Sequence, residues 1–263
     1  MRSLRRAQVV FPVSAFPAAP SQSLQPESIL GPLLPARPPA SALDPRFAAS
    51  GLFNGPVYAL HRLRLRPQLS LHCRAARYFD SLNTSESREL DLRAGLPCLP
   101  VRNPLLGGRR TAAIGIATLV ALRSGPRHHL LLGRVAAKAM PHHAGQLHVV
   151  PSGMFAPPYS IAANVANELR EELGLSLSAG RLYLSGAALN HLNLRPEICT
   201  LFVLDDPGPL SLNAEFLPGL LRIPLSSDAQ LVRALKLTAP SITPPGAAAL
   251  FLGARLLRSL IRA

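Results

Sequence analysis

Cysteine is scarce in this sequence, and its few copies form no recognisable pattern. The chain of 263 residues has 3 cysteines, which are Cys73, Cys98 and Cys199, and no C-x-x-C pair. An odd number at such wide spacing argues against a disulfide framework and against a zinc site, and it fits a reducing compartment.

Long apolar runs are also missing. No stretch reaches the roughly 20 apolar residues that a membrane-spanning helix needs, so we expect no membrane segment and a cytoplasmic protein. The alternative is an organelle, because the first residues are rich in arginine and contain no acidic residue before Glu27, as transit peptides do.

Acidic residues are few, with 14 Asp and Glu against 28 Lys and Arg, which gives a net charge of +14. The positive charges form no block of five or more, so the chain has no basic tail. A diffuse positive field suits any phosphate-bearing ligand, and it leaves nucleic-acid binding possible without specific support. The most regular basic feature is Arg62, Arg64 and Arg66, which alternate with Leu63 and Leu65 and predict a strand with a solvated basic face.

The 27 prolines are unevenly placed and divide the chain into three parts. Residues 1–50 are rich in Pro, Ala and Ser without periodicity, so we predict a disordered segment that is dispensable for the fold. Residues 51–105 predict a small extension of strands followed by a helix over 75–93. Residues 106–263 predict a compact α/β domain in which short apolar runs alternate with helical periods.

Within that domain, one helix has clear signals at both ends. Ser160 is a favourable N-cap and Gly174 a favourable C-terminal residue, which predicts a helix from Ser160 to Leu173. Apolar residues recur along it and predict a buried stripe. Four of them stand at every fourth position, and two alanines join them; they are Ile161, Val165, Leu169 and Leu173, with Ala162 and Ala166.

Three carboxylates flank this stripe. Glu168, Glu171 and Glu172 stand at i, i+3 and i+4, which places them on one helical face. So close together, they repel one another and raise each other's pKa. A hard divalent cation relieves that repulsion, and oxygen ligands alone favour Mg²⁺ or Mn²⁺ over zinc. The plain alternative is an ordinary solvated acidic face.

Residues 153–175, which we call the box segment, resemble the Nudix box, G-x5-E-x7-R-E-U-x-E-E-x-G-U with U aliphatic. Seven of its nine specified positions are matched with the spacing intact, by Gly153, Glu168, Leu169, Glu171, Glu172, Gly174 and Leu175. Two positions depart from it, since Tyr159 replaces the first Glu and Asn167 replaces the Arg. The surrounding sequence is similar to a bacterial branch with an N-terminal extension.

The resemblance implies a Nudix-type α/β/α sandwich with a mixed β-sheet over residues 106–263. It implies a Mg²⁺-dependent hydrolase that cleaves a pyrophosphate bond in a nucleoside-diphosphate-linked small molecule. Glu168, Glu171 and Glu172 would hold the Mg²⁺ or Mn²⁺ with the Gly153 carbonyl nearby, and Glu168 and Glu171 would act in catalysis.

Two questions stay open at this point. A separate general base would come from the acidic residues outside the box segment, of which we take Glu197 first; the others are Asp205, Asp206, Glu215 and Asp228. The departures at Tyr159 and Asn167 also leave an alternative function, in which the domain binds a nucleotide or RNA as a regulatory module without turnover.

Overall fold

The computed structural model describes most of the chain, namely residues 12–36, 43–47, 53–98, 100–107, 110–125, 127–137, 143–205, 210–225, 227–238 and 241–262. The first eleven residues, which carry most of the signal for a transit peptide, lie outside these ranges.

In the described part of the chain, eight strands form one mixed sheet. Six of them follow one another across it in the order β1 (Val13–Pro17), β8 (Gly180–Asn190), β9 (Pro196–Leu204), β4 (Gly115–Ser124), β5 (Arg127–Val135) and β10 (Phe216–Leu225). Two short strands lie off this path, because β6 (Leu147–Val149) pairs with β5 and β7 (Ser152–Met154) pairs with β4. The β4 and β9 strands run parallel, and the other pairs are antiparallel.

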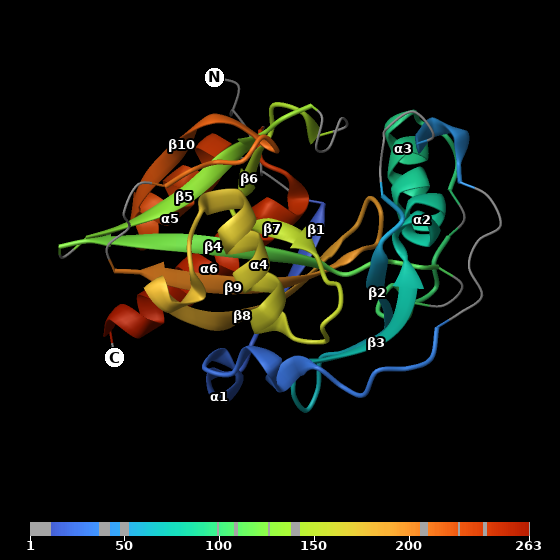
Figure 1. Cartoon of the computed structure of the whole chain (residues 1–263), viewed down its shortest axis with the longest axis horizontal. Coiled ribbons are helices and arrows are strands. Elements are labelled where there is room, and N and C mark those ends of the chain that lie inside the picture. Colours follow the sequence, from blue (N-terminus) through green and yellow to red (C-terminus); the bar gives the residue numbers. More distant parts are fainter. Residues whose placement is uncertain are drawn as a thin grey trace, which may run out of the picture.

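Helices cover both faces of this sheet (Figure 1). The helix predicted from the box segment, α4 (Ile161–Leu173), packs on one face. On the other face lie α5 (Asp228–Thr238) and α6 (Pro244–Arg262), which share a second apolar cluster with the sheet. The predicted α/β/α sandwich with a mixed sheet is therefore confirmed. No helix among the described residues is long and apolar enough to cross a membrane.

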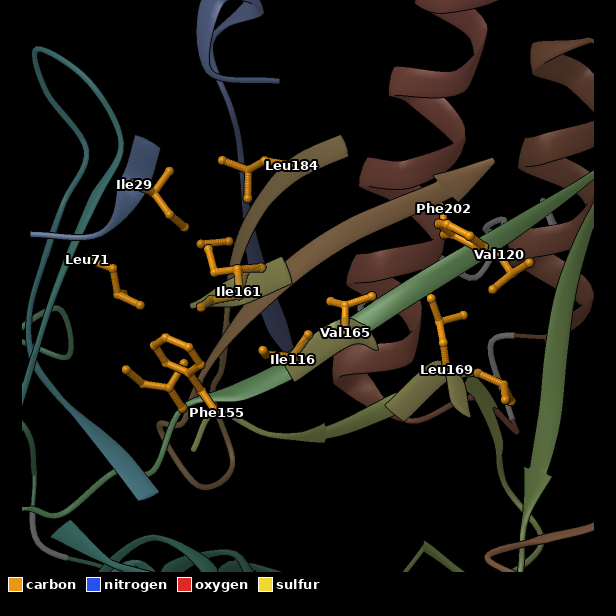
Figure 2. Packing of buried hydrophobic residues seen from close by; sticks show 14 of the residues in the cluster. Ile29, Leu71, Ile116, Val120, Phe155, Ile161, Val165, Leu169, Leu184 and Phe202 are labelled. Carbon is orange, nitrogen blue, oxygen red and sulfur yellow. The ribbon is translucent and has the colours of Figure 1, made fainter. Parts of the chain in front are cut away.

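The apolar stripe of α4 fixes this helix against the sheet. Its four members at every fourth position are all 0% exposed, and they belong to one apolar cluster with Ile116 and Val120 of β4 (Figure 2). The two predicted alanines of the stripe are only partly buried. Burying each of the four larger side chains stabilises the fold by roughly 1.5–3 kcal/mol relative to leaving it exposed. Burial of the stripe thereby sets the rotation of α4 about its own axis, and with it the direction of the glutamates.

The predicted extension forms a second, smaller layer. It holds a two-stranded ribbon of β2 (Pro56–Arg64) and β3 (Ser70–Arg77), then α2 (Tyr78–Ser81), a π-helical turn η3 (Leu82–Glu86) and α3 (Ser87–Arg93). The helical part begins later than predicted because β3 continues to Arg77. The predicted basic side chains of Arg62, Arg64 and Arg66 are exposed, as expected of a solvated face.

The prediction that residues 1–50 are disordered is wrong for the part that the structure describes. Strand β1 pairs with β8 from Val13 opposite Asn190 to Pro17 opposite Gly186. It is followed by α1 (Pro20–Ser23) and the 3₁₀ turns η1 (Pro26–Ile29) and η2 (Pro45–Phe47). Proline is compatible with an edge strand, and the burial of Ile29 and Phe47 offsets the entropy cost of ordering a proline-rich chain. The domain boundaries at residues 50 and 105 stay predictions.

We expect this N-terminal segment to be needed for stability. The Ile29→Ala variant should lower the free energy of unfolding by about 2–5 kcal/mol, the range for a buried aliphatic side chain cut to alanine, because Ile29 is 0% exposed. Urea unfolding of the full chain measures this. The matched control is Leu24→Ala, since Leu24 is 63% exposed and should cost less than about 0.5 kcal/mol. Equal stability of the two variants would contradict the packing role.

Candidate metal and active site

Both predicted ends of α4 are confirmed. Ser160 is its N-cap, and the Ser160 hydroxyl accepts a hydrogen bond from the Ala163 amide at 3.2 Å. Gly174 ends the helix in the left-handed region at a φ of 68°, a conformation that costs glycine little. The cap residues thus determine where the helix begins and ends, and with this they set the position of the glutamates along the helix axis.

A buried asparagine shapes the loop that leads into α4. Asn164 is 6% exposed, and its side-chain nitrogen donates to the carbonyls of Ala156, Pro158 and Ser160 at 2.8, 3.1 and 2.8 Å. Its side-chain oxygen accepts from the Ala156 amide at 3.0 Å. One side chain therefore holds residues 156–160 in place. The only sequence signal for this role was an amide inside a helix, where asparagine is intrinsically unfavourable.

The structure separates the three box glutamates by burial. Glu172 is 1% exposed, and one of its carboxylate oxygens accepts a hydrogen bond from the Ser152 amide of β7 at 3.1 Å. Glu168 is half-buried, whereas Glu171 is exposed. The face predicted as one acidic surface therefore presents two carboxyl groups toward β7 and one toward solvent.

Gly153 is required by the position of Glu168. A Cβ atom placed on Gly153 would lie 1.8 Å from one carboxylate oxygen of Glu168, far inside van der Waals contact. The Glu168 carboxyl group therefore lies directly on the backbone of β7. This explains in physical terms why glycine stands at the first position of the box segment.

A fourth carboxylate comes from outside the box segment. The chain after β9 docks on the C-terminal end of α4, where the Ser211 and Asn213 amides donate to the carbonyls of Leu173 and Glu172, each at 3.2 Å. The Asn213 side chain then accepts from the Glu215 amide at 2.9 Å. Glu215 acts electrostatically on both Glu168 and Glu172. From the sequence alone, Glu215 was only one of several acidic residues outside the box segment that could supply a general base.

Burial and crowding keep two of these carboxyl groups from ionising readily. Desolvation, and then the charges of Glu168 and Glu215, raise the pKa of Glu172 to about 9, although the Ser152 amide opposes the shift. Desolvation, followed by Glu171 and Glu215, raises the pKa of Glu168 to about 8. A nearby positive charge would reverse both shifts, because it stabilises the ionised forms.

The donor set fits a hard divalent cation. Glu168, Glu172 and Glu215 carry carboxylate oxygens, which is the ligand type that Mg²⁺ and Mn²⁺ prefer. Among the described residues, no three His, Cys, Asp or Glu side chains yet converge closely enough to hold an ion. The residue types therefore fit such a cation in their chemistry, whereas their present positions do not form a closed ligand set.

The two departures from the Nudix pattern have contacts of their own. The Asn167 side chain accepts a hydrogen bond from Arg170 at 3.1 Å on the exposed side of α4. The Tyr159 hydroxyl donates to the Gly31 carbonyl, and its ring lies 5.1 Å from Tyr58 in a T-shaped contact. Neither residue supplies a charge to the glutamates.

Glu197 does not lie with the box glutamates. It is in register with Gly115 of β4, whereas Gly153 is in register with the next residue, Ile116. Successive side chains alternate between the faces of a sheet, so the Glu197 side chain points away from the α4 face. It lies 3.6 Å from Arg195, and burial raises its pKa to about 7 against the opposing effect of that arginine. Glu197, the first candidate for a separate general base, therefore does not lie where a base acting beside the box glutamates would have to be.

Of the other acidic candidates, only Glu215 is placed beside the box glutamates by the described residues. Asp205 is exposed and lies 3.5 Å from Arg123. Asp206 and the side chain of Asp228 lie outside the described residues.

No protein-family model and no curated protein matches this chain. Similar solved structures include a C. elegans Ap4A hydrolase (14% identity, 56% of this chain and 98% of that one, TM-score 0.41). The Nudix domain of Shewanella oneidensis NrtR, complexed with ADP ribose, is similar at 9% identity, with 56% of this chain and 90% of that one covered and a TM-score of 0.44. The Nudix hydrolase RenU of M. smegmatis is similar at 14% identity, with 57% of this chain and 86% of that one covered and a TM-score of 0.37. With every quoted TM-score below 0.5, these likenesses carry no conclusion about activity or substrate.

The raised pKa values of Glu168 and Glu172 predict a pH dependence of stability. Both folded-state values lie above the ordinary 4.5, so the two groups stabilise the fold while protonated. That stability is fully present below about pH 4.5 and is lost as the pH rises through about 8 to 9. In EDTA we expect the Tm to fall from about pH 5 to about pH 9, and to fall less in Glu172→Gln. Identical Tm profiles of parent and variant would contradict the assignment.

The contact of Glu168 with Gly153 predicts that alanine is not tolerated there. In Gly153→Ala the added Cβ displaces the Glu168 carboxyl group, so Mn²⁺ affinity should fall about tenfold or more, as for other groups that orient metal ligands. Calorimetric titration with Mn²⁺ measures this. Ser152→Ala is the matched control, because it keeps the amide that donates to Glu172. If both variants bind Mn²⁺ alike, Gly153 does not position Glu168.

Proposed function

We propose that this protein is a Mg²⁺- or Mn²⁺-dependent hydrolase that cleaves a pyrophosphate bond in a nucleoside-diphosphate-linked small molecule. The observation that carries the proposal is a pair of carboxyl groups held against β7, Glu172 on the Ser152 amide and Glu168 on Gly153. Desolvation and then the neighbouring carboxylates raise the pKa values of both. Perturbed acids gathered at one place are typical of functional sites rather than of structural surfaces. The resemblance of residues 153–175 to the Nudix box supports the same chemistry.

Glu168, Glu172 and Glu215 would hold the cation, with Gly153 leaving space beside the first of them. When bound, the ion supplies charge neutralisation for the pyrophosphate and acidification of a water molecule. The net charge of +14 favours the approach of such an anionic substrate.

Glu171 differs from its neighbours because it reaches solvent from the same helix. It is therefore the box carboxylate that a substrate and its attacking water meet first. In the proposed reaction water forms a bond to one phosphorus, the bond from that phosphorus to the bridging oxygen breaks, and a carboxylate takes the proton of the water. We propose that Glu171 or Glu168 accepts this proton, because these two box glutamates are more exposed to solvent than Glu172.

The alternative is a binding module of the same fold that recognises a nucleotide without turnover. It is favoured by one observation, which is that Asn167 contacts Arg170 rather than the box glutamates. An enzyme that relied on a charged group at this position would lack it here.

The experiment is a screen of nucleoside-diphosphate compounds with and without Mg²⁺, in which released phosphorylated products are detected. We expect metal-dependent turnover that falls by about 10² or more in Glu172→Gln, as is usual when a key metal-site or acid–base group is removed. The matched control is Asp205→Asn, which changes an exposed carboxylate whose ion-pair partner is Arg123 of β4. This variant should retain turnover. Ligand binding without products in the parent would establish the binding module instead.

A further inference from the structure

The N-terminal turn η1 lies against the start of the helix that carries the candidate site. One carboxylate oxygen of Glu27 accepts hydrogen bonds from the Ala162 amide at 2.8 Å and from the Ser160 hydroxyl at 3.1 Å. The amide is one of the four at a helix start that lack a partner within the helix. A negative charge is also favourable there because of the helix dipole. Glu27 therefore adds a second cap to α4 from more than 130 residues away in the sequence.

The residue just before this cap is tied to the same N-terminal segment. The Tyr159 hydroxyl donates to the Gly31 carbonyl, and the Gly31 amide in turn donates to the Leu71 carbonyl of β3 at 2.9 Å. Tyr159 is also fixed laterally, since its ring contacts Tyr58 and Phe155 at centroid distances of 5.1 and 5.7 Å. The loop before α4 is thus connected through Gly31 to the ribbon of the extension.

Between these two contacts the segment is firmly anchored. Ile29 is 0% exposed and belongs to the same apolar cluster as Leu71 of β3 and Ile161 of α4 (Figure 2). Glu27 itself is exposed, but it lies only two residues from this buried side chain. Its carboxylate is therefore presented to α4 from a fixed backbone.

We propose that residues 26–31 are a working part of the candidate site, in which Glu27 and the Gly31 carbonyl position the helix that carries Glu168 and Glu172. The inference rests on the proposed function. An α-helix rises 1.5 Å per residue, so Glu168 lies roughly 10 Å along the helix from Ile161. A small change of tilt at the N-terminus is carried rigidly to the carboxylates, and metal ligands tolerate a misplacement of only about 0.5 Å. Glu27 is accordingly a positioning residue rather than a catalytic one.

The test compares Mn²⁺ affinity in the full chain, measured from the EPR signal of free Mn²⁺, for Glu27→Ala, Glu27→Gln and Tyr159→Phe. Loss of a helix cap predicts that Glu27→Ala weakens binding about threefold to tenfold. Glu27→Gln keeps an oxygen acceptor without its charge and should restore part of the affinity. The matched control is Gln25→Ala, because Gln25 is an exposed residue two positions away, and it should bind as the parent does.

Hydrogen exchange of the amides at residues 161–164 supplies the second readout, and it does not depend on a metal. Faster exchange in Glu27→Ala together with weaker Mn²⁺ binding supports the proposal. Parent-like Mn²⁺ affinity in Glu27→Ala overturns it, even if the Tm falls, because the contact would then be merely structural. If the parent binds no Mn²⁺, the proposed function fails, and exchange alone decides whether Glu27 anchors α4.

Discussion

The placement of two carboxyl groups against the backbone of one short strand is the constraint on which the site depends. Glu172 accepts from the Ser152 amide and Glu168 lies on Gly153, so Glu172 is fully and Glu168 partly removed from water, and the pKa values of both are raised. Leaving buried charge without compensation is expensive. The four fully buried residues of the α4 stripe hold the helix, and with it both carboxyl groups, in this position on the sheet.

Those parts of the site that depend on neighbours in sequence were predictable. Ser160 and Gly174 end the helix through their own backbone and hydroxyl chemistry, and the spacing of four along the stripe determines which face is buried. Short apolar runs with their own turn signals indicated strands in the domain, whereas the mixed sheet was implied by the resemblance to the Nudix box. The burial of Glu172 and the exposure of Glu171 also follow from helix geometry, because consecutive residues differ by about 100° of rotation and only Glu172 falls in line with the stripe. The i, i+3, i+4 spacing, which groups the three glutamates on one face, does not bring out this difference.

The parts that depend on distant residues could not be predicted. Glu27 and Glu215 reach the site from either side of the box segment in sequence, and nothing local in their own segments indicates a partner. The proline-rich composition around Glu27 indicated disorder, whereas the free edge of β8 supplies the pairing that orders it. The choice of Glu197 as the first candidate for a general base had no information on direction, since the face on which a strand residue points is set by register, and a shift of one residue reverses it.

Two sets of contacts connect the N-terminal part of the chain to the domain that carries the site, and they differ in how much they contribute to stability. On one side, Arg195 is buried and contacts Glu86 of the extension at 2.5 Å, while the Asn193 side chain donates to the fully buried Glu89 at 2.8 Å. Removing one partner of a buried ion pair costs about 3–5 kcal/mol, so this cluster decides whether the two layers stay together. On the other side, the exposed contact of Glu27 with α4 is worth only about 0.3–1 kcal/mol, too little to set the stability of the fold. It is enough to set the position of one helix end within a structure that the buried cluster already holds, and a candidate metal site is sensitive to that position.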